Sequence, residues 1–513
     1  MKWLLVALAV SACGSNKLSS TTQLQLTVTD ATTHAPLGAR VLLWTGDQAL
    51  HIGSIDLYGQ RQGATACQFA PGVIGTWDGI VLATGAAQVP VGVDRCAPTP
   101  AIPYGHYKVW AWHGIDHELW TGEVDLSANR GGVALEIPLA RAWDAGPNIV
   151  AADMHVHAHA SNDSGMPDTQ RVAAQVAGGI DVIGLSNHNS NGDANAAIHA
   201  LGLDGKVFSI PSNEITSEMM HAGIYPARGS APPADKVVSA SPEALMAMLR
   251  ALPDHPIIQI NHPRFRYQSL FDTTHWDGVA WPPPFPLDFD AVEVVPGYAA
   301  FNVEGDRRLD EGLRDLYTLY SHGHPVAAMG GSDTHDFNWV LDGTGRTLVE
   351  LDSPGYTEAK FLAAIRARHT VATSGPWLAV RVWPSKGTGT AVGPGGVIVA
   401  KDGKVYLSIA TAQAAWMNAT RIRITVGDQT TSVPVRKVGD LFNYEVELDV
   451  GSADTFIGVA IDGDDPEPLE LTGTYQRDKW KHPGVTPFAV ISPILVDADG
   501  DHRWKRGDAE LTY

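Results

Sequence analysis

The sequence predicts an α/β domain over residues 146–376, with an N-terminal β-sandwich over 23–145 and a C-terminal β-sandwich over 377–513. In both flanking regions apolar and polar residues alternate in short runs, which is typical of strands with one buried face. In the middle region continuous apolar runs, for example 256–260 and 325–329, alternate with helical stretches. That alternation indicates parallel strands covered by helices. A chain of 513 residues is also too long for a single hydrophobic core.

The first residues are expected to be a targeting segment rather than part of the fold. A positive start and the apolar run 3–10, too short to span a bilayer, predict a signal peptide over 1–12. Its end resembles a bacterial lipoprotein signal, in which Cys13 carries the lipid and 13–22 form a linker. Because Gly14 rather than Asp follows the cysteine, the resemblance implies a cell-envelope protein anchored at the outer membrane. An ordinary secretory signal with an incidental cysteine is the alternative.

The chain has three cysteines, and the two besides Cys13 are Cys67 and Cys96. An even pair in an oxidising compartment predicts a disulfide, and the Gly- and Pro-rich segment between them would be the loop that it closes. Two buried free thiols are the alternative.

The charge of the chain bears on its partners. A formal net charge of -20 argues against nucleic acid, because phosphate backbones attract Lys and Arg. A small anionic substrate stays open, since bound divalent cations would dominate the local field. Membrane contact is expected only through the N-terminal lipid, because no other apolar stretch reaches spanning length.

Histidines and carboxylates gather at the ends of the predicted strands. His155 and His157 stand at i and i+2, so in a strand they share one face about 7 Å apart, and Asp333 and His335 repeat the spacing. Further residues of the same types follow other apolar runs, and only His221 begins its own segment. The candidate metal ligands are His155, His157, Asp163, His188, Glu214, His221, His262, Asp333 and His335.

The chemistry of this set points to metal-dependent hydrolysis. Imidazole and carboxylate without thiolate suit zinc, manganese or iron rather than calcium or copper. The donors are too many for one ion, so two or three divalent ions are expected, with Glu214 as a natural bridge. A metal-bound hydroxide would then be the nucleophile, because the metal lowers the pKa of bound water toward about 7. The chain has no Gly-x-Ser-x-Gly elbow for a serine esterase.

An ordered series of short motifs gives the chain a resemblance to a known family. The motifs are Asp153-Met154-His155-Val156-His157, then Ser161 and Asp163, Asn187-His188-Asn189, Asn213-Glu214-Ile215-Thr216, Asn261-His262-Pro263 and Ser332-Asp333-Thr334-His335. Together they resemble the PHP (polymerase and histidinol phosphatase) superfamily, and within it the CehA/McbA branch of metallohydrolases. The motifs cover about 148–375, and the first strands resemble transthyretin-like accessory domains.

The resemblance implies a distorted (β/α)₇ barrel that holds two or three metal ions. It implies that His155 and His157 bind one ion with Glu214 and Asp333, that Glu214 binds a second with His221 and His262, and that Asp163, His188 and His335 form the third site. The family usually has Asp where this chain has Asn187, which removes one negative charge from the cluster or its surroundings. The expected catalytic residues are Glu214, Asp333, Asn187 and Arg264.

Two further residues have open roles. Arg264 begins a long loop, 265–289, rich in aromatic residues and proline. It is a candidate clamp for an anionic substrate group, and an ordinary surface arginine is the equal alternative. Glu293 either lines the rim of the site or supports a strand end.

We therefore expect a hydrolase that uses metal-bound hydroxide on small-molecule phosphoesters. Hydrolysis of carboxylic or carbamate (aryl) esters at the same metals is the alternative that the CehA resemblance implies. A non-catalytic binding protein at the cell surface is the third, with Asn187 as its one supporting residue. The sequence leaves the oligomeric state and the natural substrate open.

Overall fold

The chain adopts a mixed α/β fold that is richer in strands than in helices. The computed structural model describes residues 22–45, 48–49, 67–75, 79–92, 101–127, 132–229, 231–265, 268–279, 288–297, 308–335, 342–435, 441–463, 486–507 and 509–513. The predicted signal peptide 1–12, the lipidation site Cys13 and the disulfide partner Cys96 lie outside these residues, so these expectations stay predictions.

The N-terminal part consists of two sheets around one core. Its strands are β1 (Gln23–Asp30), β2 (Ala39–Thr45), β3 (Gln48–Ala49), β4 (Cys67–Ala70), β5 (Val73–Gly75), β6 (Gly79–Leu82), β7 (Ala86–Pro90), β8 (His106–Trp112), β9 (Trp120–Asp125) and β10 (Val133–Leu139). One sheet has the order β10-β1-β7 and the other β4-β5-β6-β2-β8-β9. Leu26 and Val41 pack between them, and the exposed positions of β1 alternate with buried ones, as the period-2 pattern predicts.

The middle part alternates strands and helices. Its elements are β11 (Ile149–Val156), α1 (Asp168–Ala177), β12 (Val182–Leu185), α2 (Asn195–Ala200), β13 (Phe208–Ser209), β14 (Asn213–Thr216), β15 (His221–Tyr225), α3 (Ala234–Val237), α4 (Pro242–Arg250), β16 (Ile257–Ile260), α5 (Leu270–Thr273), β17 (Ala291–Pro296), α7 (Arg308–Ser321), β18 (Ala327–Gly331), β19 (Arg346–Glu350), α8 (Glu358–Arg366) and β20 (Thr370–Thr373). Ser241 and Thr357 cap α4 and α8, each accepting a hydrogen bond from the third backbone amide that follows it.

These strands do not form a closed barrel within the described residues. β13-β12-β11 are parallel neighbours in one sheet, and β16-β17-β18 are parallel neighbours in another that begins with β14 and β15. Isolated bridges join the two sheets, Val156 to Thr334 and His188 to Glu214. The pairing of β14 with β15 and of β15 with β16 is antiparallel, which departs from uniform βα alternation.

The C-terminal strands extend the sheet of the middle part. They are β21 (Trp377–Trp383), β22 (Val397–Val399), β23 (Lys404–Ala412), β24 (Arg421–Val426), β25 (Gln429–Pro434), β26 (Phe442–Asp449), β27 (Thr455–Asp462), β28 (Phe488–Ile491), β29 (Ile494–Asp497), β30 (Arg503–Arg506) and β31 (Ala509–Thr512). β21-β23-β26 form a separate sheet, but β28 pairs with β20 and so joins an 11-stranded sheet that runs from β13 to β25. Strands from both sides of the boundary predicted at 376 therefore belong to one sheet.

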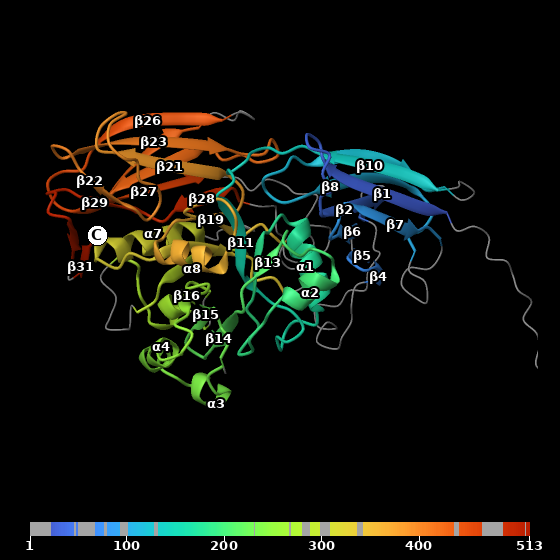
Figure 1. Cartoon of the computed structure of the whole chain (residues 1–513), viewed down its shortest axis with the longest axis horizontal. Coiled ribbons are helices and arrows are strands. Elements are labelled where there is room, and N and C mark those ends of the chain that lie inside the picture. The colour runs from blue at the N-terminus through green and yellow to red at the C-terminus, as the bar shows by residue number, and fades with distance from the viewer. Residues whose placement is uncertain are drawn as a thin grey trace, which may run out of the picture.

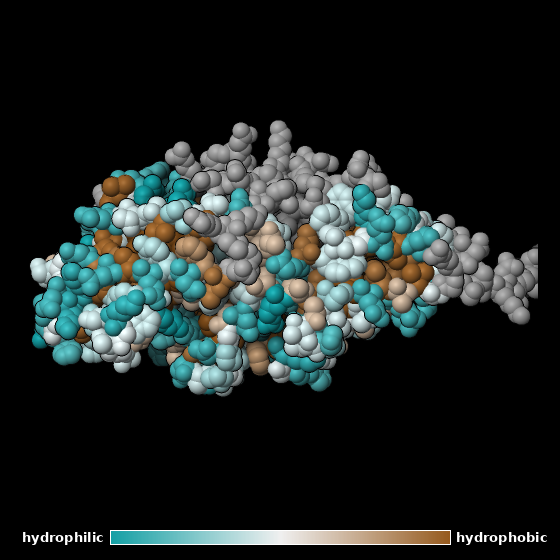
Figure 2. Space-filling view, turned by 90° about the horizontal axis from the view of Figure 1, so that it is seen from above, coloured by the Kyte–Doolittle hydropathy of each residue, from teal (hydrophilic) through white to brown (hydrophobic). Residues whose placement is uncertain are grey.

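The three parts pack against one another. Figure 1 shows the N-terminal strands (blue to cyan) at one end of the long axis, the C-terminal strands (orange to red) at the other, and the helical middle part between and below them. Trp416 donates its indole N–H to the His117 carbonyl at 2.9 Å, which ties the two flanking parts directly. Figure 2 shows hydrophilic side chains interspersed with small apolar patches on one face. None of the described helices is long and apolar enough to cross a bilayer.

Candidate metal centre

All nine predicted ligands come together at one end of the parallel strands. His155 is the next-to-last residue of β11, and His188 and His262 follow β12 and β16 within three residues. Asp333 follows β18, whereas Glu214 lies within β14 rather than after β13. The C-terminal ends of neighbouring parallel strands share an edge, so residues far apart in sequence meet there.

The ligand atoms form four overlapping groups, and within each group they lie within 4.8 Å of one another. The groups are His157, Asp163, His188 and His335; His155, His262 and Asp333; His155, His157 and Glu214; and His188, Glu214 and His221. Shared members link the groups, so the donors form one continuous cluster.

Glu214 is the centre of this cluster. Its side chain is fully buried, with Oε1 3.0 Å from His155 Nε2 and 3.2 Å from His221 Nδ1, and with Oε2 2.9 Å from His188 Nδ1. Asp333 Oδ1 lies 3.1 Å from His155 Nε2. These two carboxylates each face several imidazoles, which is the arrangement of a ligand that bridges ions.

Asp163 lies at the more open side of the cluster. Its Oδ2 is 3.1 Å from both His188 Nε2 and His335 Nε2. The side chains of Asp163 and His335 are 29% and 18% exposed, against 0% for His155 and Glu214. A substrate would therefore approach from the side of Asp163 and His335.

Four imidazoles have Nδ1 held by a neighbouring group while Nε2 faces a carboxylate. The Nδ1 contacts are His155 with Glu293 at 3.1 Å, His157 with Ser161 at 3.0 Å, His188 with Thr216 at 2.6 Å and His335 with the Asp333 carbonyl at 2.9 Å. His188 differs from the others, because its Nδ1 also lies 2.9 Å from Glu214 Oε2. In metal sites the outer partner of an imidazole sets its tautomer and orientation. The residues present thus fit a metal, with Nε2 as the donor atom of His155, His157 and His335.

Buried polar atoms without hydrogen bonds support the same conclusion. His221 Nε2 is buried and makes no hydrogen bond, and the polar neighbours of His157 Nε2, Glu214 Oε2 and His221 Nδ1 are other members of the cluster. Such atoms are costly unless an ion or water satisfies them. Zinc, manganese and iron suit this set of nitrogen and oxygen donors.

The electrostatics of the cluster are those of a cation site. Burial by itself would raise the pKa of Glu214, but the imidazoles of His221, His155 and His188 hold it well below its usual range. Burial would lower the pKa of His188, but Glu214 and Asp163 raise it to about 10. The ionised carboxylates therefore favour positive charge on the groups that face them.

The partition of the ligands differs from the one that the resemblance implies. His262 groups with His155 and Asp333 rather than with His221. His221 groups with His188 and Glu214. The expected third site, Asp163, His188 and His335, is brought together, and His157 joins it.

Two ligands sit on strained backbone. His262 and Asp333 have φ of 26° and 52°, in the left-handed region that residues with side chains rarely adopt. The Asp333 amide donates to the His155 carbonyl at 2.8 Å, and the His262 amide donates to Glu293 Oε2 at 2.7 Å. Strain of this kind persists where surrounding bonds determine it, and it concentrates at functional sites.

Asn187 is buried beside the cluster. Its side-chain oxygen accepts a hydrogen bond from the Ala158 amide at 2.8 Å. A carboxylate oxygen at this position would accept the same bond. The structure therefore gives Asn187 a positioning role for the segment after His157.

Glu293, whose role the sequence left open, supports the site: it contacts both His155 and His262, as described above, and is 1% exposed. The sequence interpretation gave no supporting role to Asn261 or Gln259. Asn261 donates its amide to Glu214 Oε1 at 2.9 Å, and Gln259 donates to Asn261 Oδ1 at 2.9 Å. The polar residues at alternate positions of an otherwise apolar strand, 259 and 261, were the available signal.

Arg264 is not placed as a substrate clamp. Its guanidinium donates to both carboxylate oxygens of Asp315, at 2.7 and 3.0 Å, and to the Trp276 carbonyl at 2.6 Å. It also lies over the Phe271 ring at 5.4 Å. The side chain is 10% exposed, so these contacts describe an internal anchor rather than either a clamp or an ordinary surface arginine.

Comparisons of the chain with protein-family models, with curated proteins and with solved structures find no match. The resemblance to the PHP superfamily thus rests on the motifs, and the site is interpreted from its own geometry.

Proposed function

We infer that the chain is a metal-dependent hydrolase of small-molecule esters, with phosphoesters as the first substrate class. The observation that carries this inference is the convergence of six histidine side chains on the carboxylates of Glu214, Asp333 and Asp163. Divalent ions bound there would polarise the ester and supply hydroxide at neutral pH. The chain belongs, on this proposal, to the PHP superfamily, and β11, β12 and β14 to β18 correspond to its distorted (β/α)₇ barrel between two sandwiches.

The chain's own residues would provide binding and orientation. Glu214 and Asp333 would bridge ions in the buried part of the cluster, where neither carboxylate contacts a lysine or arginine within the described residues. Asp163 and His335, at the open side, would meet the substrate. The low-dielectric surroundings strengthen every such electrostatic contact.

Hydrolysis of carboxylic or carbamate aryl esters is the second candidate. Arg264 is held by Asp315 and so supplies no cation to a phosphate. Phe265, next in the chain, is 37% exposed, and its ring centroid lies 5.6 Å from that of His262. An aromatic wall beside a ligand favours an aryl group over a second phosphate contact.

The binding-protein alternative loses its support. It rested on Asn187, and the bond from Ala158 accounts for this residue without the loss of a ligand.

The test combines metal analysis with a substrate comparison. The purified protein should contain at least two equivalents of transition metal and should hydrolyse one of p-nitrophenyl phosphate, bis-p-nitrophenyl phosphate, p-nitrophenyl acetate or an aryl carbamate. Glu214→Gln should reduce turnover by more than about 100-fold, because second-sphere losses alone reach 10- to 100-fold. Glu218→Gln, an exposed glutamate nearby, is the matched control. A folded protein that binds no transition metal would refute the proposal.

A further inference from the structure

The segment after His157 turns back so that one serine reaches several candidate ligands. Ser161 donates its backbone N–H to the Ala158 carbonyl at 2.9 Å, which closes a turn directly after the histidine. The turn brings the Ser161 side chain to the group of His157, Asp163, His188 and His335, called the Asp163 group below. Ser161 is 4% exposed, so its hydroxyl bonds to the protein rather than to solvent.

The Ser161 hydroxyl has three polar neighbours in this group. Its oxygen lies 3.0 Å from His157 Nδ1, 2.9 Å from Asp163 Oδ1 and 3.3 Å from the backbone nitrogen of His188. A hydroxyl offers one hydrogen to donate and two lone pairs that accept. The three neighbours therefore use its full hydrogen-bonding capacity.

Only one arrangement of hydrogens satisfies all three contacts. An ionised carboxylate can only accept, and the His188 backbone amide can only donate. The hydroxyl hydrogen therefore goes to Asp163, and Nδ1 of His157 must donate to the serine oxygen. This fixes the tautomer of His157 and leaves the lone pair of its Nε2 for a metal ion.

The same hydroxyl selects which oxygen of Asp163 faces the other ligands. Because Oδ1 accepts from Ser161, Oδ2 is the atom that lies 3.1 Å from both His188 Nε2 and His335 Nε2. One residue with no lone pair left for a metal thus orients the donor atoms of two members of the Asp163 group and holds the backbone of a third.

We propose that Ser161 is a positioning residue that tunes the Asp163 group for metal by fixing the tautomer of His157 and the orientation of the Asp163 carboxylate. This rests on the proposed function in one respect, that the group binds a metal ion. Outer partners of metal ligands typically change metal affinity 10- to 100-fold. Ser161 contacts no member of the group of His155, His262 and Asp333 among the described residues, so its loss should affect one ion rather than all.

The experiment measures metal binding rather than turnover. The intact wild type and Ser161→Ala are stripped with a chelator and titrated with Co²⁺ against a chromophoric competitor. The variant should bind one equivalent at least tenfold more weakly and the remaining metal with wild-type affinity. The visible absorption of bound Co²⁺, which reports ligand geometry, should change only in the part that the weakened equivalent contributes.

A double variant tests whether Ser161 acts through the Asp163 group. Asp163→Asn removes a ligand of that group, so adding Ser161→Ala to it should change the affinity for the remaining metal by less than about twofold. Residues that act on one site are non-additive in this way, whereas independent structural losses add. Ser161→Gly removes the same hydroxyl and should show the same loss as Ser161→Ala if the alanine variant does not fold.

The first control is another buried serine of the middle part. Ser209 is 8% exposed, and its hydroxyl oxygen accepts the Ala194 amide at 2.9 Å. It contacts no candidate metal ligand in the part of the chain that the structure describes. Ser209→Ala should therefore leave every metal affinity unchanged.

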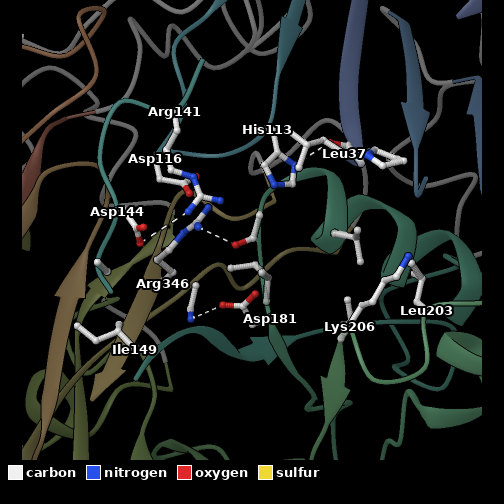
Figure 3. A pocket seen from close by; sticks show the side chains of 18 of the residues that line it. Leu37, His113, Asp116, Arg141, Asp144, Ile149, Asp181, Leu203, Lys206 and Arg346 are labelled. Carbon is white, nitrogen blue, oxygen red and sulfur yellow. Dashed lines mark hydrogen bonds and ion pairs between the residues drawn. The ribbon is translucent and has the colours of Figure 1, made fainter. Parts of the chain in front are cut away.

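The second control lies at the opposite end of β11. A cavity of about 340 Å³ lies there between the N-terminal strands and the middle part, and Figure 3 shows Asp116 and Asp181 among the side chains around it. Ile149 at this cavity is six residues, or roughly 20 Å, before His155. Asp181 Oδ2 accepts the Ala151 amide of β11 at 2.8 Å, so Asp181→Asn perturbs the same strand and should keep wild-type metal affinity.

The outcomes separate this proposal from the proposed function. Full metal affinity in folded Ser161→Ala, beside a wild type that binds metal, would overturn the role of Ser161 alone. An equal loss in Ser209→Ala or Asp181→Asn would also overturn it, because the effect would then be general. A folded wild type that binds no transition metal would refute both proposals.

Discussion

The side-chain oxygen of Asn187 accepts the backbone amide of Ala158 at 2.8 Å, directly after the ligand His157. We expect Asn187→Ala to destabilise the protein by about 1–3 kcal/mol, because it leaves this buried amide unpaired. Asn187→Asp keeps an acceptor and should retain wild-type metal content. Chemical denaturation and metal analysis of the two variants check this, and equal stability of the alanine variant and the wild type would contradict it.

Glu293 positions two candidate ligands, because it contacts the His155 ring at Nδ1 and accepts the backbone amide of His262. Glu293→Gln should weaken metal binding about 10- to 100-fold, as is typical for outer partners of metal ligands. Competition with a chromophoric chelator measures the affinity. The exposed Glu218→Gln variant should bind metal normally, and a matching loss there would show a non-specific effect.

Asp163 belongs to only one of the four groups of candidate ligands, whereas Glu214 belongs to two. Asp163→Asn should therefore lose one equivalent of metal and keep the rest, while Glu214→Gln should lose more than one. Removal of all metal by chelation should lower the melting temperature, because the buried carboxylates and imidazoles lose their counter-ions. Metal analysis and thermal denaturation measure both effects, and identical metal content in the two variants would argue against a shared bridge.

Arg264 and Asp315 form a two-pronged ion pair in which Asp315 is 1% exposed. Arg264→Met should cost about 3–5 kcal/mol, because it leaves the buried aspartate with only the 3.7 Å contact to Arg314, and the double variant Arg264→Met/Asp315→Leu should recover much of this loss. Urea denaturation tests the stability. The ratio of kcat/KM for an aryl phosphate to that for an aryl carbamate should change little in these variants. A selective loss of phosphate turnover would instead indicate that Arg264 binds the phosphate group.

The pKa of Asp181 is raised to about 6, chiefly by burial and also by the charge of Asp116, while the Ala151 amide, Arg346 and Arg141 act in the opposite direction. A raised pKa in the folded state means that this group's contribution to stability is present below pH 3.8 and is lost as the pH rises through about 6.

Asp181→Asn should therefore gain stability relative to the wild type as the pH rises from 4.5 to 7.5, by about 2 kcal/mol in total. The other charged groups of the cavity, His113, Asp144 and Lys206, are unchanged in this comparison. Denaturation at the two pH values, with Asp204→Asn as control, measures the difference in unfolding free energy between the variant and the wild type. If this difference were the same at both pH values, the raised pKa of Asp181 would be refuted.

The sequence was sufficient to predict the collection of ligands but not their partition. Residues at the ends of apolar runs were bound to meet, because parallel strands end at one edge. Which imidazole faces which carboxylate depends on side-chain rotamers and strand tilt, so His262 was assigned to His221 although it groups with His155. The role of Glu293 depends on its contact with a strand 138 residues earlier in the chain, which no local pattern encodes.

The fold shows the same limit. The alternating strands of both flanking parts and the helices of the middle part follow from local periodicity. Local periodicity does not predict the pairing of β20 with β28, because these strands are more than a hundred residues apart. The boundary predicted at 376 therefore separated two strands that are neighbours in one sheet. The cavity lined by Asp116 and Asp181 likewise forms only where the N-terminal and middle parts of the chain pack together.

The pairing of β20 with β28 also sets the order in which the protein can be completed. β28 (Phe488–Ile491) lies near the C-terminus, yet it occupies an interior position in the sheet, between β20 and β27. Until it is synthesised, β20 presents an open edge with unpaired backbone groups, which is a template for association between chains. The middle part therefore cannot complete this sheet before residues 488–491 are synthesised, and a chain cut after residue 376 would expose the edge of β20 and tend to aggregate.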